Sequence, residues 1–202
     1  MYKNIIFDLG NVLLSFNPKE YLNGKLEKSR AEKVLKEIFL SEEWIKLDEG
    51  TITEIEAIEN ISLRNEDYRE DIKKAFENWY DILIPINETV EILKDLKENG
   101  YNLYYLSNFH DIAFKKVKEK YDFFNLFDGG VVSYEDKLLK PDERIYKAIL
   151  ERYSLVPKES IFIDDTKINV DAAKEVNIEA IVFENANKLK EDLKYLGLNI
   201  SN

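Results

Sequence analysis

The chain has 202 residues, which suits one domain or a core domain that carries a smaller inserted one. Hydrophobic residues make up 45% and charged residues 34%, a balance that supports a sizeable core and argues against global disorder. Lys and Arg total 29 against 40 Asp and Glu, and the net charge of -11 disfavours binding to nucleic acid or to anionic membranes.

The first predicted element is a short buried strand at residues 5–7, where three apolar side chains follow one another. No strand pattern occurs between residues 14 and 85. That stretch instead predicts helices at residues 18–26, 30–40, 42–47, 53–64 and 66–80. Thr51 or Thr53 can cap the fourth of these helices. We interpret residues 15–84 as an all-helical cap domain, inserted into a core domain of residues 1–14 and 85–202.

Strands and helices alternate through the rest of the chain. Apolar runs predict strands at residues 103–106, 131–132, 161–163 and 180–183, and helical patterns lie at residues 89–99, 111–121, 141–153, 167–176 and 187–196. Gly100 is suited to a helix C-cap, and Pro141 to the first position of a helix. This β-α alternation predicts an α/β fold, a doubly wound, Rossmann-like parallel sheet.

Polar residues stand where the predicted strands end or the following helices begin. They are Asp8 after the first strand, Ser107 and Asn108 after the second, Lys140 before the helix at Pro141, and Asp164 and Asp165 after the fourth. Ligands of an open parallel sheet bind outside the carboxyl ends of the strands, so these residues are expected to meet in one crevice. Each alone fits an ordinary turn or helix cap, but the ordered set favours a catalytic site.

This set of residues suits phosphoryl transfer. Neighbouring carboxylates are costly to bury unless a cation lies between them, and Mg²⁺ prefers oxygen ligands. Lys140, Ser107 and Asn108 can bind phosphoryl oxygens, while Asp8 can attack phosphorus and form an aspartyl-phosphate. The pattern predicts a Mg²⁺-dependent phosphatase of a small phosphorylated metabolite, with Asp8 and Lys140 as catalytic residues.

Over nearly its full length the sequence resembles the haloacid dehalogenase (HAD) superfamily. The four motifs that carry the resemblance are Asp8 to Leu13, Leu106 to Asn108, Lys140 with Pro141, and Asp164 with Asp165 and the later Asn169. The helical insertion is similar to the small cap of the subclass that contains haloacid dehalogenases and many sugar-phosphate phosphatases. The motifs look closest to a bacterial branch with α-D-glucose-1-phosphate phosphatases, which suggests a sugar 1-phosphate as substrate.

The resemblance also implies roles for individual residues. Asp8 would be both nucleophile and metal ligand, the backbone carbonyl of Gly10 a second ligand, and Asp165 a direct third ligand. Asp164 would bind the metal directly or through water.

Gly10 departs from the pattern of the family. Most phosphatases of this superfamily carry at that position an Asp that protonates the leaving group and later activates water. Loss of a general acid typically costs about 10²–10⁴-fold in rate, and less for a leaving group that departs easily. His110 is a candidate substitute, or else an exposed polar residue on a first helical turn. Phe16, Trp44 and Trp79 either line the substrate pocket or pack the cap helices.

Two rival functions remain. A haloacid dehalogenase would use Asp8 to displace halide from carbon, but that branch carries an aromatic residue after Leu9, so Gly10 fits poorly. A non-catalytic protein that binds a phosphorylated ligand is the rival from another class.

The expected setting of the protein is the cytoplasm, because the N-terminus has no signal-peptide pattern and no stretch reaches the length of a membrane span. The absence of Cys excludes disulfides, thiolate metal sites and a catalytic thiol. We expect a monomer or a weak homo-oligomer, without nucleic-acid or membrane partners.

Overall fold

The computed structural model describes residues 1–201. Within that range a parallel sheet has the strand order β3-β2-β1-β4-β5, which confirms the predicted doubly wound α/β fold. Its strands are β1 (Asn4–Phe7), β2 (Asn102–Ser107), β3 (Gly129–Val132), β4 (Ser160–Asp164) and β5 (Glu179–Val182). Every residue of the central strands β1 and β4 is buried, as expected for strands with helices on both faces.

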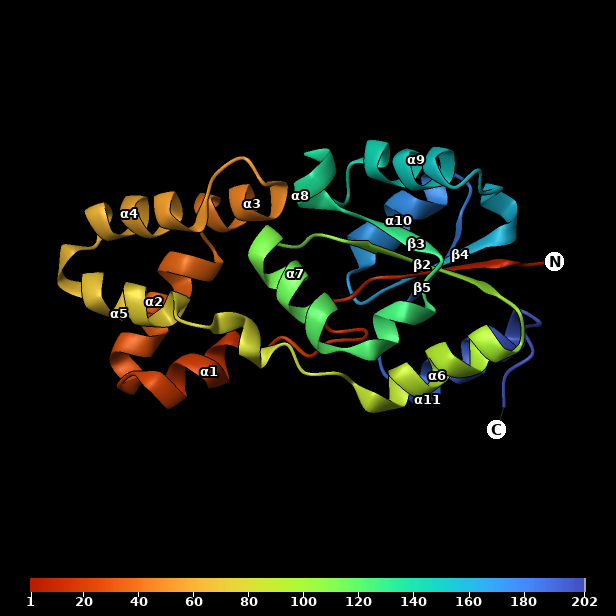
Figure 1. The fold of residues 1–202 in the computed structure, drawn as a ribbon, viewed down its shortest axis with the longest axis horizontal. Helices are drawn as coiled ribbons and strands as arrows, with labels where there is room; N and C mark the ends of the chain where they lie inside the picture. Colours follow the sequence, from red (N-terminus) through yellow and green to blue (C-terminus); the bar gives the residue numbers. More distant parts are fainter. Residues whose placement is uncertain (202) are drawn as a thin grey trace.

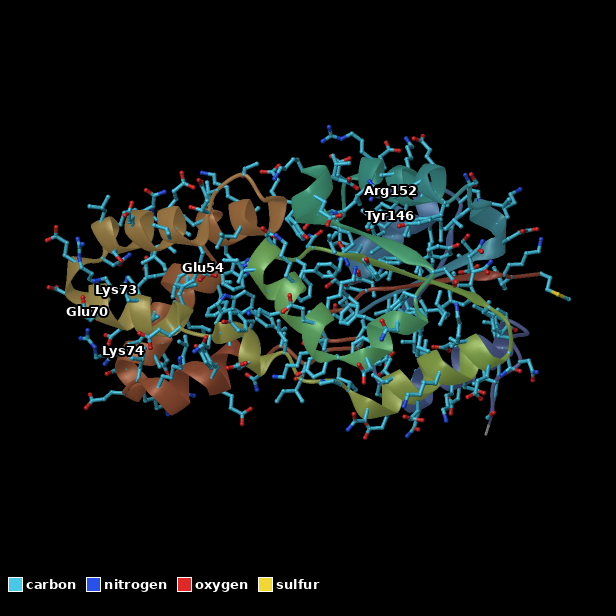
Figure 2. All side chains as sticks on the ribbon, in the orientation of Figure 1. Glu54, Glu70, Lys73, Lys74, Tyr146 and Arg152 are labelled. Carbon is cyan, nitrogen blue, oxygen red and sulfur yellow. The ribbon has the colours of Figure 1, made fainter. Side chains whose placement is uncertain are left out.

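Helices cover both faces of this sheet (Figure 1). On one face, α9 (Glu143–Arg152) and α10 (Lys167–Glu175) pack against the strands, and on the other lie α6 (Asn87–Glu98) and α11 (Ala186–Tyr195). Helix α7 (Asp111–Lys120) follows β2, and the short α8 (Ser133–Asp136) follows β3. Tyr146 of α9 (Figure 2) is buried, and its ring lies edge-on to that of Phe162 with centroids 5.6 Å apart.

The remaining helices lie together beyond one end of the sheet, at the left of Figure 1. They are α1 (Pro18–Lys25), α2 (Lys28–Phe39), α3 (Glu42–Glu49), α4 (Glu54–Arg64) and α5 (Arg69–Phe76), and we call them the cap helices. Where the chain leaves and re-enters the sheet region, the Ser15 amide donates to the Ile84 carbonyl at 2.8 Å and the Ile86 amide to the Leu13 carbonyl at 2.9 Å. The two crossing segments therefore run side by side. The exact domain division at residues 14 and 85 stays a prediction.

Local signals place several helix ends where the sequence predicts them. Thr53, not Thr51, caps α4 in a reciprocal capping box with Glu56. Gly100 directly follows the C-cap of α6 and has a φ of 83°, a conformation that glycine adopts without steric cost.

Two predicted helices are wrong in detail. The helix predicted at residues 66–80 is broken into a 3₁₀ turn at Glu66–Tyr68, then α5, then a second 3₁₀ turn at Trp79–Ile82. Asn78 separates the last two with a φ of 54°, a left-handed conformation that ends an α-helix. The helix predicted from Pro141 begins at Glu143, because the side chain of Asp142 accepts a capping hydrogen bond from the Arg144 amide.

No helix within residues 1–201 combines the length and the apolar character that crossing a membrane requires.

Candidate functional site

The structure brings the predicted polar residues together at the carboxyl end of the sheet. Asp8 directly follows β1, while Ser107 is the last residue of β2 and Asp164 the last of β4. Because β2, β1 and β4 are neighbours in the sheet, their ends present these three side chains to one another. All three side chains are buried.

Asp8 lies at the centre of this group. Its Oδ1 accepts a hydrogen bond of 2.6 Å from the Ser107 hydroxyl and one of 2.7 Å from the Leu9 amide. The same oxygen lies 2.8 Å from the Lys140 ammonium, which also donates to Asp164 Oδ2 at 2.6 Å. A buried ammonium thus joins two buried carboxylates, an arrangement that is costly to form unless every charge has partners.

Asn108 holds the segment that carries Lys140. The Asn108 Oδ1 accepts from the Lys140 amide at 2.8 Å, and its Nδ2 donates to the Lys140 carbonyl at 3.1 Å. The sequence gives no sign of this pairing. The pairing gives Asn108 a role in positioning Lys140. Its contact with phosphate stays a prediction.

Burial and the neighbouring charges set the protonation of this group. Burial raises the pKa of Asp8 to about 7, and Lys140 opposes that rise. Burial acts to lower the pKa of Lys140, yet Asp8 and Asp164 outweigh it and hold the pKa above its ordinary value. Lys140 is therefore charged at neutral pH, and a further positive charge beside Asp8 would favour its carboxylate form.

Three carboxylates offer a site for a cation. One oxygen each from Asp8, Asp164 and Asp165 lies within 4.8 Å of the others. An all-oxygen donor set of this kind fits a hard divalent ion such as Mg²⁺ better than a softer transition metal. Asn169 donates to both oxygens of Asp164 at 3.1 Å, and Asn11 donates to Asp165 Oδ2 at 3.2 Å, so outer contacts orient two of the carboxylates.

Gly10 opens onto a cavity of about 100 Å³ that separates this polar group from the cap helices. The other lining residues are Phe16, Trp44, Asp48, Trp79, Leu83, Asn108, Phe109 and His110. Trp44 stacks on Phe16 with centroids 6.1 Å apart and meets Trp79 edge-on at 4.9 Å. The aromatic residues for which the sequence left two roles open therefore have both: they pack the cap helices and they line the cavity.

His110 is buried, with 3% of its surface exposed, and so it is not the exposed residue that one reading of the sequence allowed. It occupies the N-cap position of α7 without a capping side-chain hydrogen bond, and its Nε2 lies 3.2 Å from Asp48 Oδ1. Burial lowers the pKa of His110 to about 3, so the imidazole is neutral at physiological pH. A neutral imidazole lacks the extra proton that an imidazolium would donate as a general acid.

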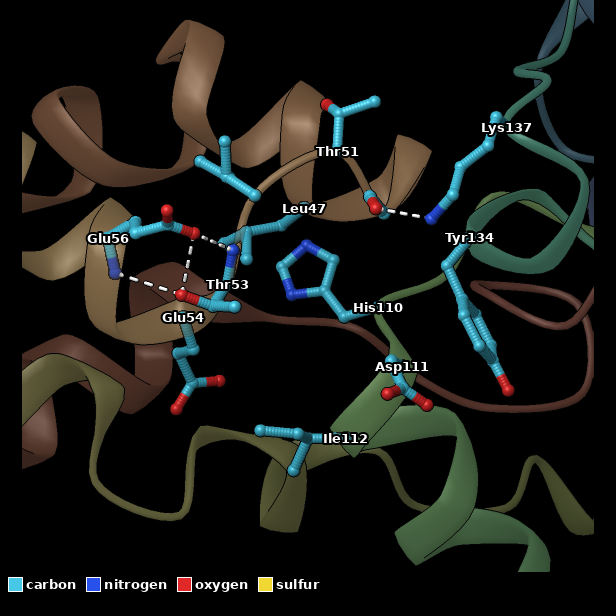
Figure 3. Close-up of a pocket in the computed structure, with 12 residues that line it drawn as sticks. Leu47, Thr51, Thr53, Glu54, Glu56, His110, Asp111, Ile112, Tyr134 and Lys137 are labelled. Carbon is cyan, nitrogen blue, oxygen red and sulfur yellow. Dashed lines mark hydrogen bonds between the residues drawn. The ribbon is translucent and has the colours of Figure 1, made fainter.

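His110 also borders a second, larger cavity of about 290 Å³ (Figure 3). Its ring there faces the turn between α3 and α4, and Tyr134 and Lys137 stand on the opposite side. The lining of this second cavity includes none of the carboxylates that surround Lys140.

Known proteins resemble this chain in sequence. A family model described as haloacid dehalogenase-like hydrolase matches residues 2–177. A sesquiterpene phosphatase of Aspergillus oryzae, astK, is 28% identical over 177 residues, which cover 88% of this chain and 87% of the relative. A phosphorylated carbohydrates phosphatase of Thermotoga maritima is 25% identical over 179 residues, 88% of this chain and 82% of the relative.

A solved structure shares the fold over almost its whole length. It is a HAD family enzyme of Bacteroides thetaiotaomicron, bt-2542, in complex with magnesium and inorganic phosphate. The two superpose with a TM-score of 0.73 at 29% identity, and the match covers 94% of this chain and 99% of that one.

Proposed function

The chain belongs to the haloacid dehalogenase-like hydrolases, and within that family we propose that it is a Mg²⁺-dependent phosphatase that acts through a phosphorylated Asp8. One observation carries the proposal. The same oxygen of Asp8 contacts Ser107 and Lys140, while the carboxylate is also one of the three that can share a cation. A nucleophile, groups that bind phosphate and a metal site thus coincide at one side chain.

The residues divide the chemistry among them. Asp8 attacks phosphorus, and Lys140 and the Ser107 hydroxyl turn from Asp8 to the phosphoryl oxygens, where their positive charge and hydrogen bond offset the developing negative charge. Asn108 keeps the Lys140 backbone in place and faces the cavity beside Gly10. Asp8, Asp164, Asp165 and the Gly10 carbonyl would hold the ion. When bound, Mg²⁺ neutralises charge on Asp8 and on the phosphate.

Two classes of small phosphorylated metabolite are supported as substrates. A sugar phosphate, such as a sugar 1-phosphate, follows from the resemblance of the motifs and from the carbohydrate phosphatase among the relatives. An ester of an apolar alcohol follows from the aromatic lining of the cavity beside Gly10, and the terpenoid phosphatase among the relatives agrees with it. We also propose that the protein acts in the cytoplasm as a monomer or a weak homo-oligomer.

A phosphatase screen tests the proposal. Phosphate release would be measured over a panel of sugar 1-phosphates, terpenyl phosphates and aryl phosphates, with Mg²⁺ and with excess chelator. We expect turnover that chelator abolishes and that Asp8→Asn lowers by on the order of 10⁴-fold or more. Halide release from 2-haloacids without Mg²⁺ would favour the dehalogenase instead. Tight binding of a panel compound without any turnover, even at high enzyme concentration, would refute the phosphatase.

A further inference from the structure

The cavity beside Gly10 has an acidic side chain on its far wall. Gly10 lines the core side, and a Cβ built there would meet no atom within 4 Å, so the space for a side chain at this position is open. Asp48, near the C-terminal end of cap helix α3, lines the same cavity. Asp48 from the cap therefore lines the same cavity as position 10, where a longer side chain would have room.

The end of α3 is tied to the core, which fixes the place of Asp48. The Ser133 hydroxyl, just after β3, donates to the Asp48 carbonyl and accepts from the Phe109 amide at 2.9 Å. The Lys137 ammonium donates to the Gly50 carbonyl two residues further along (Figure 3). Two core side chains thus hold the backbone around Asp48, and its carboxyl group does not depend on the cap helices alone for its position.

The polar neighbour of Asp48 is His110, whose ring nitrogens are incompletely hydrogen-bonded. Within residues 1–201 neither ring nitrogen of buried His110 has a hydrogen bond of good geometry, although its Nε2 lies 3.2 Å from Asp48 Oδ1 and the Trp44 backbone is close enough to act on its pKa. Buried polar atoms are nearly always satisfied by protein, water or ligand, so incompletely bonded ring nitrogens at the edge of a cavity indicate a place where a ligand or water binds. That place adjoins both Asp48 and Gly10.

We propose that Asp48 is the general acid and general base of this enzyme, a catalytic residue supplied by the cap in place of the side chain that Gly10 lacks. The proposal rests on the proposed function, since it assigns the proton transfers of the same reaction.

Asp48 gives up a proton in the first step of the reaction and takes one back in the second. In the first step Asp8 forms a bond to phosphorus, the bond from phosphorus to the leaving-group oxygen breaks, and that oxygen takes the proton of Asp48. In the second step water attacks the aspartyl-phosphate, its proton goes to the Asp48 carboxylate, and the bond between phosphorus and Asp8 breaks. The products are an alcohol and inorganic phosphate, and both carboxyl groups return to their starting states.

Burial favours the protonated form of Asp48 before the reaction. Burial raises its pKa to about 8, Lys140 opposes the rise, and Asp8 adds to it. His110, the remaining titratable group in contact, is neutral at physiological pH. At neutral pH the carboxyl group therefore holds a proton that it can donate, although 21% of the side chain is exposed.

A leaving-group series tests the role of Asp48. The substrates would run from 2,4-dinitrophenyl phosphate, whose leaving group departs without a proton, to an alkyl phosphate, whose leaving group needs one. We expect Asp48→Asn to lower kcat/KM for the alkyl phosphate by about 10²–10⁴-fold and to leave kcat/KM for the dinitrophenyl ester nearly unchanged. Glu49→Gln, which removes the neighbouring carboxylate of the same helix, is the matched control and should affect neither substrate.

The second step has its own measurement. With the dinitrophenyl ester, Asp48→Asn should release the phenol in a burst close to one per enzyme, followed by slow turnover, because water activation is lost after Asp8 is phosphorylated. Acid-quench labelling should then find the phosphoryl group on the protein. Adding Gly10→Asp to Asp48→Asn should restore part of the activity on the alkyl phosphate, since the site has room for that side chain.

The outcomes separate this inference from the proposed function. If the wild-type protein hydrolyses no phosphate ester, the proposed function is wrong, and the assignment of Asp48 is then wrong as well. If the wild type is active but Asp48→Asn lowers kcat/KM equally for every leaving group, or not at all, the inference alone is overturned. An unchanged circular dichroism spectrum and a cooperative thermal transition verify that the Asp48→Asn protein is folded.

Discussion

The two walls of the cavity beside Gly10 are built in opposite ways. On the core side, Gly10 and Asn108 line the cavity. The buried residues next to them, Asp8, Lys140 and Asp164, which we call the core wall, each make several short polar contacts to one another or to the strand ends. The cap wall consists mainly of aromatic rings in contact, with a partly exposed Asp48, and the ring of His110 from the start of α7 lies against it without a hydrogen bond of good geometry in the described chain. A fixed, charged wall suits a constant group such as phosphate, whereas an apolar wall with spare polar atoms suits a group that differs between substrates.

The largest expected effect comes from breaking the core wall at Lys140. Lys140→Met leaves two buried carboxylates without their counter-charge, which should lower the free energy of unfolding in chelator by about 3–5 kcal/mol. The substitution also removes the positive charge that Lys140 places beside the phosphoryl group, and this should lower kcat by about 10²–10³-fold. Urea unfolding and steady-state kinetics measure the two effects.

Lys147→Met is the matched control for that change. Its exposed pair with Glu143 on α9 should contribute less than about 1 kcal/mol and nothing to catalysis. Equal effects of the two substitutions would contradict the contrast between a buried, charged wall and the ordinary surface.

The pH dependence of stability separates two titratable groups that line the cavity, Asp48 of the cap and His110 of the core. The folded pKa of Asp48 lies above its unfolded value, so the folded state binds the extra proton and stability falls as pH rises from about 4 to 8. His110 acts in the opposite direction, but only below about pH 6.5, where the unfolded state takes up its proton.

Between pH 6.5 and 8, chelated protein should therefore lose stability by on the order of 1 kcal/mol per pH unit through Asp48, and Asp8 should add to this loss only up to about pH 7, the value of its folded pKa. Urea unfolding at a series of pH values measures the slope, and Asp48→Asn should make it shallower. An identical slope in wild type and variant would show that Asp48 is already ionised in the folded protein.

A smaller effect is expected from the aromatic part of the cap wall. Phe16→Leu removes a ring that stacks on Trp44 and faces the cavity, at a cost of about 0.5–1.5 kcal/mol in binding an apolar or aryl leaving group. The KM for such esters should rise by up to about tenfold, while the rate of hydrolysis of phosphorylated Asp8 stays constant.

Phe39→Leu is the control for the aromatic wall, because Phe39 packs against Phe16 but does not line the cavity. If both substitutions change KM alike, the cap wall influences substrates only through its general packing.

The smallest effect tests whether the cap can be weakened without harm to the chemistry. Thr53→Ala removes the capping box of α4 and should lower the free energy of unfolding by about 1 kcal/mol. Thermal unfolding would detect this as a shift of about 2–4 °C, with kcat unchanged. A matching fall in kcat would mean that the end of α3 depends on α4 for its position.

Features that depend on neighbours along the chain could be predicted from the amino-acid sequence. Apolar runs identified every strand of the described sheet, and Thr53 with Glu56 identified the start of α4. The sequence also predicted that the residues of the core wall lie together, because the carboxyl ends of parallel strands lie at one edge of a sheet whatever connects them. Where a local conformation competed with a helical pattern, as at Asn78 and Asp142, the prediction extended the helix too far.

The residues opposite Gly10 are brought there by contacts that form only in the folded protein. Asp48 reaches the cavity because the end of α3 is bonded to Ser133 and Lys137, and His110 is buried because Trp44 and Trp79 of the cap pack against its ring. These contacts join residues far apart in the chain and leave no periodic pattern along it. An isolated Asp within a helix that is rich in charged residues looks like part of its solvated face, and only the packing of cap on core indicates otherwise.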